Sequence, residues 1–337
     1  MFAYTLRRLA FAIPTLLVIS FITFAILDLA PGDPTAQLPL TVPMEVRLKI
    51  IESLGLNEPF HIRYLLWAKQ FFINEPLNLI EQYTGWSFGN SEDRLRVLSW
   101  STRSPVVDLI AERMPQTLWV VGMSYVVAVV IAIPIGVISA YYQYSIFDQI
   151  GTLFSMIGFS VPTFFTGLVL IVVFSVNLGW LPSVYDTTLE VTDLSSFWAQ
   201  VKQMAMPTMV LALATTAQIS RFMRASMLDN LNQDYVRTAR AKGLRERSVV
   251  LLHVLRNSMI PVVTVIALGV PSIFGGAIIT EQIFKVNGLG ALLIIGIQGA
   301  DMPLVQSLTF LFAVLIVAFN LIADVLYGIL DPRIRYD

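Results

Sequence analysis

Six stretches without a charged side chain limit what this 337-residue chain can fold into. A helix that crosses a bilayer needs about 20 mostly apolar residues, and such a helix satisfies its own backbone hydrogen bonds inside lipid. The sequence therefore predicts an all-α integral membrane protein with six transmembrane helices. Two of the stretches are longer than one crossing needs, so part of each is expected at the interface or in a loop. The predicted spans are residues 9–27, 114–147, 149–185, 203–220, 257–280 and 302–323.

Basic residues indicate how these spans are oriented. An arginine pair precedes the first span, another follows the last, and eight of the 22 Lys and Arg residues lie between Arg221 and Arg256. The short loops at 177–205 and 281–301 each hold a single lysine. Short loops rich in Lys and Arg stay in the cytoplasm. We therefore expect both termini and the loop at about 225–258 to be cytoplasmic.

The region between the first two spans is too polar to cross a membrane. It predicts a sizeable extracytoplasmic loop domain, because long loops are translocated regardless of their charge. The expected division is 1–30 for the N-terminal segment and first span, 31–113 for the loop domain, and 114–337 for the remaining spans. The first span also fits a secretory signal peptide, but it lacks an Ala-x-Ala cleavage site, which favours an uncleaved anchor.

The loop at 225–258 contains a short helix-forming segment. Val236, Ala239 and Gly243 have the spacing of one small-residue helical face, and Gly243 is suited to the left-handed turn that ends a helix. A short helix with a small face and a basic flank is suited to docking into a groove of another protein. The alternative is an ordinary basic loop that only fixes the topology.

The sequence YVRTARAKGL, followed by HVLRNSMIPVV, resembles the cytoplasmic coupling loop of bacterial ABC-importer permeases, in the form typical of the dipeptide/oligopeptide branch. The first Glu and Ala of the general motif, and its later Ile and Pro, are replaced here. The resemblance implies a coupling helix that docks on an ATPase. The implied ATPase-coupling residues are Arg237, Thr238, Ala239, Arg240, Ala241, Lys242 and Gly243.

Similarity to that family extends along most of the chain. It includes LAPGDP at 29–34, LGLNEP at 54–59, SPVVDLIAERMPQTL at 104–118, TEQIFKVNGLGALL at 280–293 and NLIADVLYGILDPRIR at 320–335. Residues 92–103 are an apparent insertion with no assigned role.

The resemblance implies the type I ABC importer transmembrane fold, in the first-permease (B-type) branch, in a bacterial inner membrane. The chain is expected to form half of an alternating-access pathway for peptides or similar solutes. Oligosaccharides, opines, glutathione and metal chelates remain alternative substrates. The implied partners are a second, homologous permease subunit in a heterodimer, two ATPase subunits that bind ATP and Mg, an extracytoplasmic solute-binding protein and membrane lipid.

No cofactor, metal site or catalytic residue is expected in the chain itself. It lacks a G-x-x-x-x-G-K-[ST] loop for ATP phosphates and has no cysteine, and its two histidines are far apart in sequence. The net charge of −1 offers no nucleic-acid footprint. An intramembrane enzyme needs a catalytic cluster that the sequence does not show. The alternative of a different class is a channel or secondary transporter. It needs charged rings or inverted repeats, and the sequence shows no internal repeat.

A few residues within or beside the spans are candidates for the pathway or its structure. Pro162 in GFSVPTFFTGL predicts a kink that allows close helix packing or a pore-lining bend. Asn320, Asp324, Tyr327 and Asp331 follow one helical face. Asp324 is a functional candidate, because an intramembrane carboxylate is costly, and equally a candidate for a structural anchor. Trp86 and Phe88 are expected to seal the loop domain rather than bind a ligand.

Overall fold

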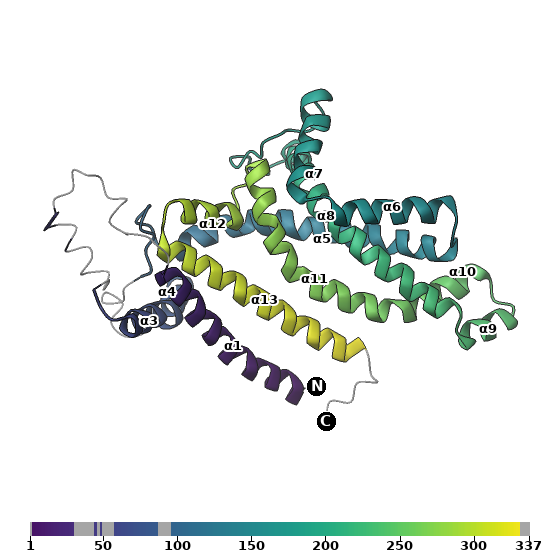
Figure 1. Cartoon of the computed structure of the whole chain (residues 1–337), viewed down its shortest axis with the longest axis horizontal. Coiled ribbons are helices and arrows are strands. Elements are labelled where there is room, and N and C mark those ends of the chain that lie inside the picture. Colours follow the sequence, from purple (N-terminus) through teal and green to yellow (C-terminus); the bar gives the residue numbers. More distant parts are fainter. Residues whose placement is uncertain (1, 30–43, 46–47, 49–56, 87–95, 331–337) are drawn as a thin grey trace. The chain divides into compact units, whose positions relative to one another are not determined.

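The computed structural model describes residues 2–29, 44, 45, 48, 57–86 and 96–330. This part of the chain is helical apart from loops and one isolated antiparallel bridge between Leu98 and Pro105 (Figure 1). The elements are α1 (Phe2–Leu29), α3 (Phe60–Lys69), η1 (Gln70–Asn74), α4 (Glu75–Thr84), α5 (Val106–Tyr141), α6 (Ile146–Ser160), α7 (Thr163–Leu170), η2 (Ile171–Asn177), α8 (Leu194–Leu231), α9 (Asp234–Ala241), α10 (Glu246–Ser248), η3 (Val249–Val254), α11 (Leu255–Phe284), α12 (Leu289–Gln298) and α13 (Met302–Leu330).

The chain forms two compact units. The first unit consists of Met1–Ala10, Gln116–Ala291 and Leu315–Asp337, and the second consists of Phe11–Pro115 and Leu292–Val314. The second unit therefore combines most of the predicted loop domain with helical segments from both ends of the chain.

Within the described residues, four helices are long and apolar enough to cross a membrane. They are Thr5–Leu29, Val106–Tyr141, Glu246–Pro271 and Met302–Val325. Two bent helix pairs raise the number to six if each pair counts as one span. These pairs are Ile146–Ser160 with Thr163–Asn177, bent by 109°, and Ala277–Phe284 with Leu289–Gln298, bent by 83°.

The candidate spans agree with the predicted ones in part. The first, second, fifth and sixth predicted spans overlap the four long helices, and the third overlaps the first bent pair. The helix of the second begins earlier than its uncharged stretch, at Val106, and ends at Tyr141, so that residues 142–145 form the loop expected within this stretch. The first turns of α5 contain charged residues, so the uncharged stretch in the sequence begins later than the helix. The turn after α5 ends at Ser145, whose extended backbone precedes α6.

The fourth predicted span lies inside α8, which is not among the described helices that are apolar enough by composition alone to cross a membrane. At 38 residues and about 1.5 Å per residue, α8 is roughly 57 Å long, which exceeds the hydrocarbon thickness. Its sequence is mixed, with Gln200, Lys202 and Gln203 near its start. Asp193 caps that start by accepting a hydrogen bond from Ser196 N at 2.7 Å. The hydrogen bond from the Ser196 hydroxyl lowers the pKa of Asp193.

Small residues let α5 and α6 approach α8 closely in the first unit. A Cβ at Gly136 on α5 would lie 2.5 Å from Met223 Cβ and 2.8 Å from the Ser220 carbonyl oxygen. A Cβ at Gly158 on α6 would lie 3.2 Å from Ala217 Cβ. Close approach of this kind is the main source of packing energy between helices in lipid.

A buried carboxylate organises the bend between α11 and α12. Glu281 Oε2 accepts a hydrogen bond from Ala291 N at 2.9 Å, and Oε1 accepts one from the Thr117 hydroxyl at 2.7 Å. A Cβ at Gly288 would lie 2.3 Å from Glu281 Oε1, and one at Gly290 would lie 2.5 Å from Ile278 Cα. The segment GLG in the motif at 280–293 is therefore glycine-rich because its backbone closes on this carboxylate.

In the second unit, aromatic side chains surround Trp67, which is 7% exposed. Its ring contacts Phe24, Phe71 and Phe310 at centroid distances of 5.8, 5.4 and 6.3 Å. Trp67 is thus the aromatic residue at the centre of the core of this unit. Trp86, which was expected to help close this core together with Phe88, is 70% exposed.

Part of the apparent insertion at 92–103 holds the start of α13. Asp301 is fully buried and accepts hydrogen bonds from the Ser101 hydroxyl at 2.8 Å and from Trp100 N at 3.0 Å. Asp301 also accepts a bond from Leu304 N at 3.3 Å, as an N-cap residue does. The inserted residues 99–101 therefore have a structural role within the second unit.

Several expected features lie outside the described residues. They are residues 30–34 of the motif at 29–34, residues 54–56 of the motif at 54–59, Phe88, and the basic C-terminal segment with Asp331.

The contact at Gly136 predicts a stability effect. Gly136→Ala should force α5 away from α8 and lower the free energy of unfolding by about 1–3 kcal/mol, because both atoms it would meet belong to rigid parts of α8. Gly122→Ala is the matched control on the same helix, since a Cβ there meets nothing within 4 Å. Thermal unfolding in detergent measures both variants. An unchanged Tm for Gly136→Ala would contradict the close α5–α8 approach.

Candidate functional site

The predicted short helix in the basic loop is present as α9. It begins after Gln233, and its last turn closes through a hydrogen bond from Gly243 N to Arg240 O at 2.9 Å. Gly243 has φ +75°, which confirms the predicted left-handed turn. A Cβ at Gly243 would meet nothing within 4 Å, so backbone conformation alone favours glycine here.

One face of α9 packs inside the chain. Val236 is 0% and Ala239 6% exposed. They belong to one apolar cluster, here called the loop core, which joins α5, α8, α9, η3 and α11. The buried members of the loop core are Ala132, Ala140, Ile219, Met223, Met227, Val236, Ala239, Val249, Val250, Val254 and Val262.

This packing corrects one prediction. The small-residue face was expected to dock on another protein, but Val236 and Ala239 are covered by the chain's own helices, and Gly243 alone of the three is exposed. The spacing of Val236 and Ala239 correctly indicated an apolar face, yet spacing does not say which surface covers that face. Any partner must therefore contact the opposite side of α9.

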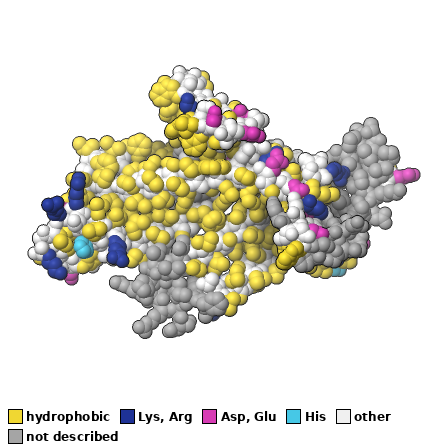
Figure 2. All heavy atoms as spheres, turned by 180° about the vertical axis from the view of Figure 1, so that it is seen from behind, with side chains coloured by type: hydrophobic (Ala, Val, Ile, Leu, Met, Phe, Trp, Pro, Cys, Tyr) yellow, Lys and Arg dark blue, Asp and Glu magenta, His cyan; other side chains and the backbone are white. Residues whose placement is uncertain are grey.

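The opposite side of α9 is exposed and basic. Figure 2 shows Lys and Arg side chains gathered around α9 and α10, next to the mostly apolar surface of neighbouring helices. The exposed residues among the predicted coupling positions are Arg237, Thr238, Arg240, Ala241, Lys242 and Gly243.

Ion pairs give this surface a partly fixed shape. Arg240 binds the carboxylate of Glu246 through Nη2 at 2.7 Å and Nε at 3.2 Å, which ties α9 to α10. This carboxylate raises the pKa of the Arg240 guanidinium. Arg237 lies 3.6 Å from Asp234, but both side chains are largely exposed, and such pairs contribute little to stability.

The helices on either side of the loop are joined by reciprocal hydrogen bonds. The Ser226 hydroxyl on α8 donates to Ser258 O at 2.9 Å, and the Ser258 hydroxyl on α11 donates to Ser226 O at 3.2 Å. Both residues are buried. These bonds therefore hold together the two helices, α8 and α11, between which the loop containing α9 lies.

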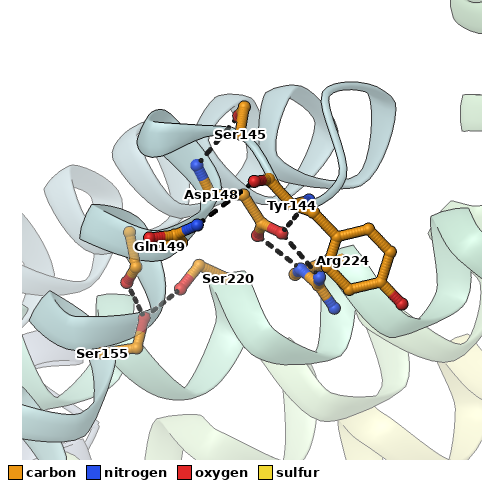
Figure 3. A network of polar contacts seen from close by, with 8 residues as sticks. Tyr144, Ser145, Asp148, Gln149, Ser155, Ser220 and Arg224 are labelled. Atoms are coloured by element: carbon orange, nitrogen blue, oxygen red, sulfur yellow. Dashed lines mark hydrogen bonds and ion pairs between the residues drawn. The ribbon is translucent and has the colours of Figure 1, made fainter.

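An ion pair joins α8 to α6 close to the loop core (Figure 3). Arg224 donates to the two carboxylate oxygens of Asp148 from Nε at 2.6 Å and from Nη2 at 2.7 Å. The same carboxylate accepts a bond from Tyr144 N at 2.9 Å. Asp148 and Arg224 were not predicted, although Asp148 is the single charge in the otherwise uncharged stretch 114–185. That isolated charge was a usable signal for a buried partner.

The other predicted residues lie apart from the loop core. At Pro162 the chain breaks rather than kinks, since Val161 is extended and α6 ends at Ser160. Asp324 forms an ion pair with Arg8 at 3.0 Å, which joins α1 to α13. Asn320 is exposed on α13. None of these three residues is a buried member of the loop core.

The apolar helices define the class of this protein as a multi-pass membrane protein. Residues 132–336 match the family "Binding-protein-dependent transport system inner membrane component", and residues 1–121 match the N-terminal component of the same systems. The chain belongs to this family, whose members are permease components of ABC transporters and are not themselves catalytic. It is therefore an inner-membrane permease.

Similarity to known permeases covers the whole chain. It is 42% identical over 337 residues to the oligopeptide transport system permease protein AppB of Bacillus subtilis (strain 168), with both chains fully covered. It is 36% identical over 340 residues to the glutathione transport system permease protein GsiC of Escherichia coli (strain K12), again with full coverage of both chains. The protein of the same name from Salmonella choleraesuis (strain SC-B67) is 35% identical over 337 residues, also with full coverage.

The two faces of α9 predict opposite responses to the same substitution. Ala239→Asp should detach α9, because an uncompensated charge in an apolar core costs about 3–5 kcal/mol. Ala241→Asp, two residues further on the exposed side, should leave the loop folded. Limited trypsin digestion at the exposed Arg and Lys residues of α9 measures this difference. Equal cleavage rates in the two variants would mean that Ala239 is not buried.

Proposed function

We propose that this chain is the membrane-spanning permease subunit of an ATP-driven importer and forms half of its pathway for peptides or peptide-like solutes. One observation carries the coupling part of this proposal. Helix α9 has one face packed into the loop core and the other face exposed and basic. Because α9 is packed against the loop core, a displacement of its exposed face by a partner protein also displaces the helices of the loop core.

The substrate class rests on the relatives. Their names give oligopeptides for one system and glutathione, itself a small peptide, for the other. A peptide or peptide-like solute is the class common to both. Oligosaccharides, opines and metal chelates remain alternatives from the wider branch of the family.

The proposed assembly contains a second, homologous permease subunit as the other half of a heterodimer. Two ATPase subunits bind ATP and Mg, and an extracytoplasmic binding protein delivers the solute. One of the ATPase subunits docks on this chain at Arg237, Thr238, Arg240, Ala241, Lys242 and Gly243. Hydrolysis takes place in the ATPase subunits, and their closure moves α9 and drives alternating access. Ala239 contributes from the inside, as the contact that holds α9 to the loop core.

We further propose six spans with both termini cytoplasmic, namely α1, α5, α6–α7, α8, η3–α11 and α13. In this arrangement α12 is a re-entrant helix, and the extracytoplasmic loop domain lies between α1 and α5. The distribution of Lys and Arg supports α8 as a span, because without it the basic loop and the loop at 177–205, which holds a single lysine, would lie on the same side.

Reporter fusions test this topology directly. A fusion after Arg245 should read cytoplasmic, and a fusion after Glu190 should read extracytoplasmic, because α8 separates them. A fusion after Ser91 should match the one after Glu190. If the fusions after Glu190 and Arg245 read the same side, α8 does not cross the membrane and the proposed six-span arrangement is wrong.

The docking site is tested by the exposed alanine of α9. Ala241→Asp should lower co-purification of the ATPase subunits and ATP-dependent uptake by about fivefold or more, because an added carboxylate opposes acidic partners of the basic face. Ala199→Asp is the matched control, on an exposed position near the start of α8. If Ala241→Asp retains both co-purification and uptake, α9 does not carry the docking surface.

A further inference from the structure

We infer that Asp148 and Arg224 are positioning residues that transmit the movement of α9 to the bent helix pair α6–α7. The inference rests on the proposed function, since it needs an ATPase that moves α9. It adds a route through named residues that the family assignment does not supply.

The first step of the route runs from α9 to α8. Val236 and Ala239 share the loop core with Met223 and Met227, which are both 0% exposed. Since buried side chains are closely packed, α9 cannot move relative to this part of α8 without opening a cavity. Arg224 directly follows Met223, so the packed segment and the charged side chain belong to the same helical turn.

The second step crosses from α8 to α6 through the ion pair. The Asp148 side chain is 5% exposed and the Arg224 side chain 28%. Their bidentate contact fixes direction as well as distance, because both carboxylate oxygens meet guanidinium nitrogens in one plane. The hydrogen bond from Tyr144 N to the Asp148 carboxylate also connects this ion pair to the turn between α5 and α6. The pair therefore fixes the axial register of α6 on α8 at this point, in addition to the packing between the two helices.

The third step follows α6 away from the loop. The Ser155 and Ser220 hydroxyls lie 3.2 Å apart, and Gly158 lies close against Ala217. The α6–α8 pair is therefore joined over several turns (Figure 3). Beyond it the chain breaks at Pro162 and turns by 109° into α7. A shift of α8 would move α6 with it and swing α7 about this break.

The test begins with Asp148→Asn, which keeps the shape of the side chain and removes its charge. In proteoliposomes that contain the complete transporter, solute uptake per ATP hydrolysed should fall roughly tenfold, within the range of ordinary coupling free energies. The amount of assembled complex and the binding-protein-stimulated hydrolysis should remain. Asp229→Asn, which removes the charge of an exposed carboxylate on α8 outside the proposed docking residues, is the matched control and should leave the uptake ratio unchanged.

A disulfide provides the rescue, because the natural chain contains no cysteine. Ser155→Cys with Ser220→Cys places two thiols where the hydroxyls are 3.2 Å apart. In the Asp148→Asn background, oxidation should restore uptake per ATP, and reduction should return it to the lowered value of that variant. With Asp148 intact, the oxidised pair should transport normally, since the inference requires α6 and α8 to move together.

Two results would overturn the inference. One is an unchanged uptake ratio in Asp148→Asn. The other is loss of uptake on oxidation of the cysteine pair with Asp148 intact, which would show that α6 must slide past α8, and this second result is informative even if Asp148→Asn does not assemble. Absence of ATP-driven uptake by the unmodified complex would instead contradict the proposed function.

Discussion

The packing of Val236 and Ala239 into the loop core is the contact on which the proposed mechanism depends. It fixes a short, polar helix, which would not be stable alone, against α5, α8 and η3. Because this face is covered, the basic residues of α9 are turned outward as a stiff surface. A loop that only fixed the topology would not require such burial. The same contact therefore explains both why α9 folds and how a force on it reaches the helices.

Buried carboxylates hold the rest of the structure together in a consistent way. Asp148, Glu281 and Asp301 are all buried, and each accepts hydrogen bonds from several donors. Burial of a charge is costly unless such partners are present. Each of the three joins segments that are distant in sequence, such as Thr117 with Glu281 and Ser99 with Asp301. Small residues then supply the close contacts, as at Gly136.

The sequence predicted those elements that depend only on the residues within a short segment of the chain. The apolar spans were found because hydrophobicity over one crossing depends on no tertiary contact, and the left-handed turn at Gly243 follows from residue type. The extent of α8 was missed because hydropathy does not register the polar ends of a long helix. At Pro162 the expected kink is a break, since the residue before proline favours an extended backbone. The partner of Asp148 and the surface covering Ala239 depend on the tertiary fold.

In the proposed mechanism, this chain is a passive pathway that separate ATPase subunits move. Uptake of a labelled peptide by proteoliposomes, with the chain reconstituted beside its second permease, ATPase subunits and binding protein, distinguishes this mechanism from secondary transport. Uptake should require ATP and should stop when the ATPase subunits are omitted. Uptake driven by an ion gradient, without ATP or ATPase subunits, would rule the mechanism out and indicate a secondary transporter.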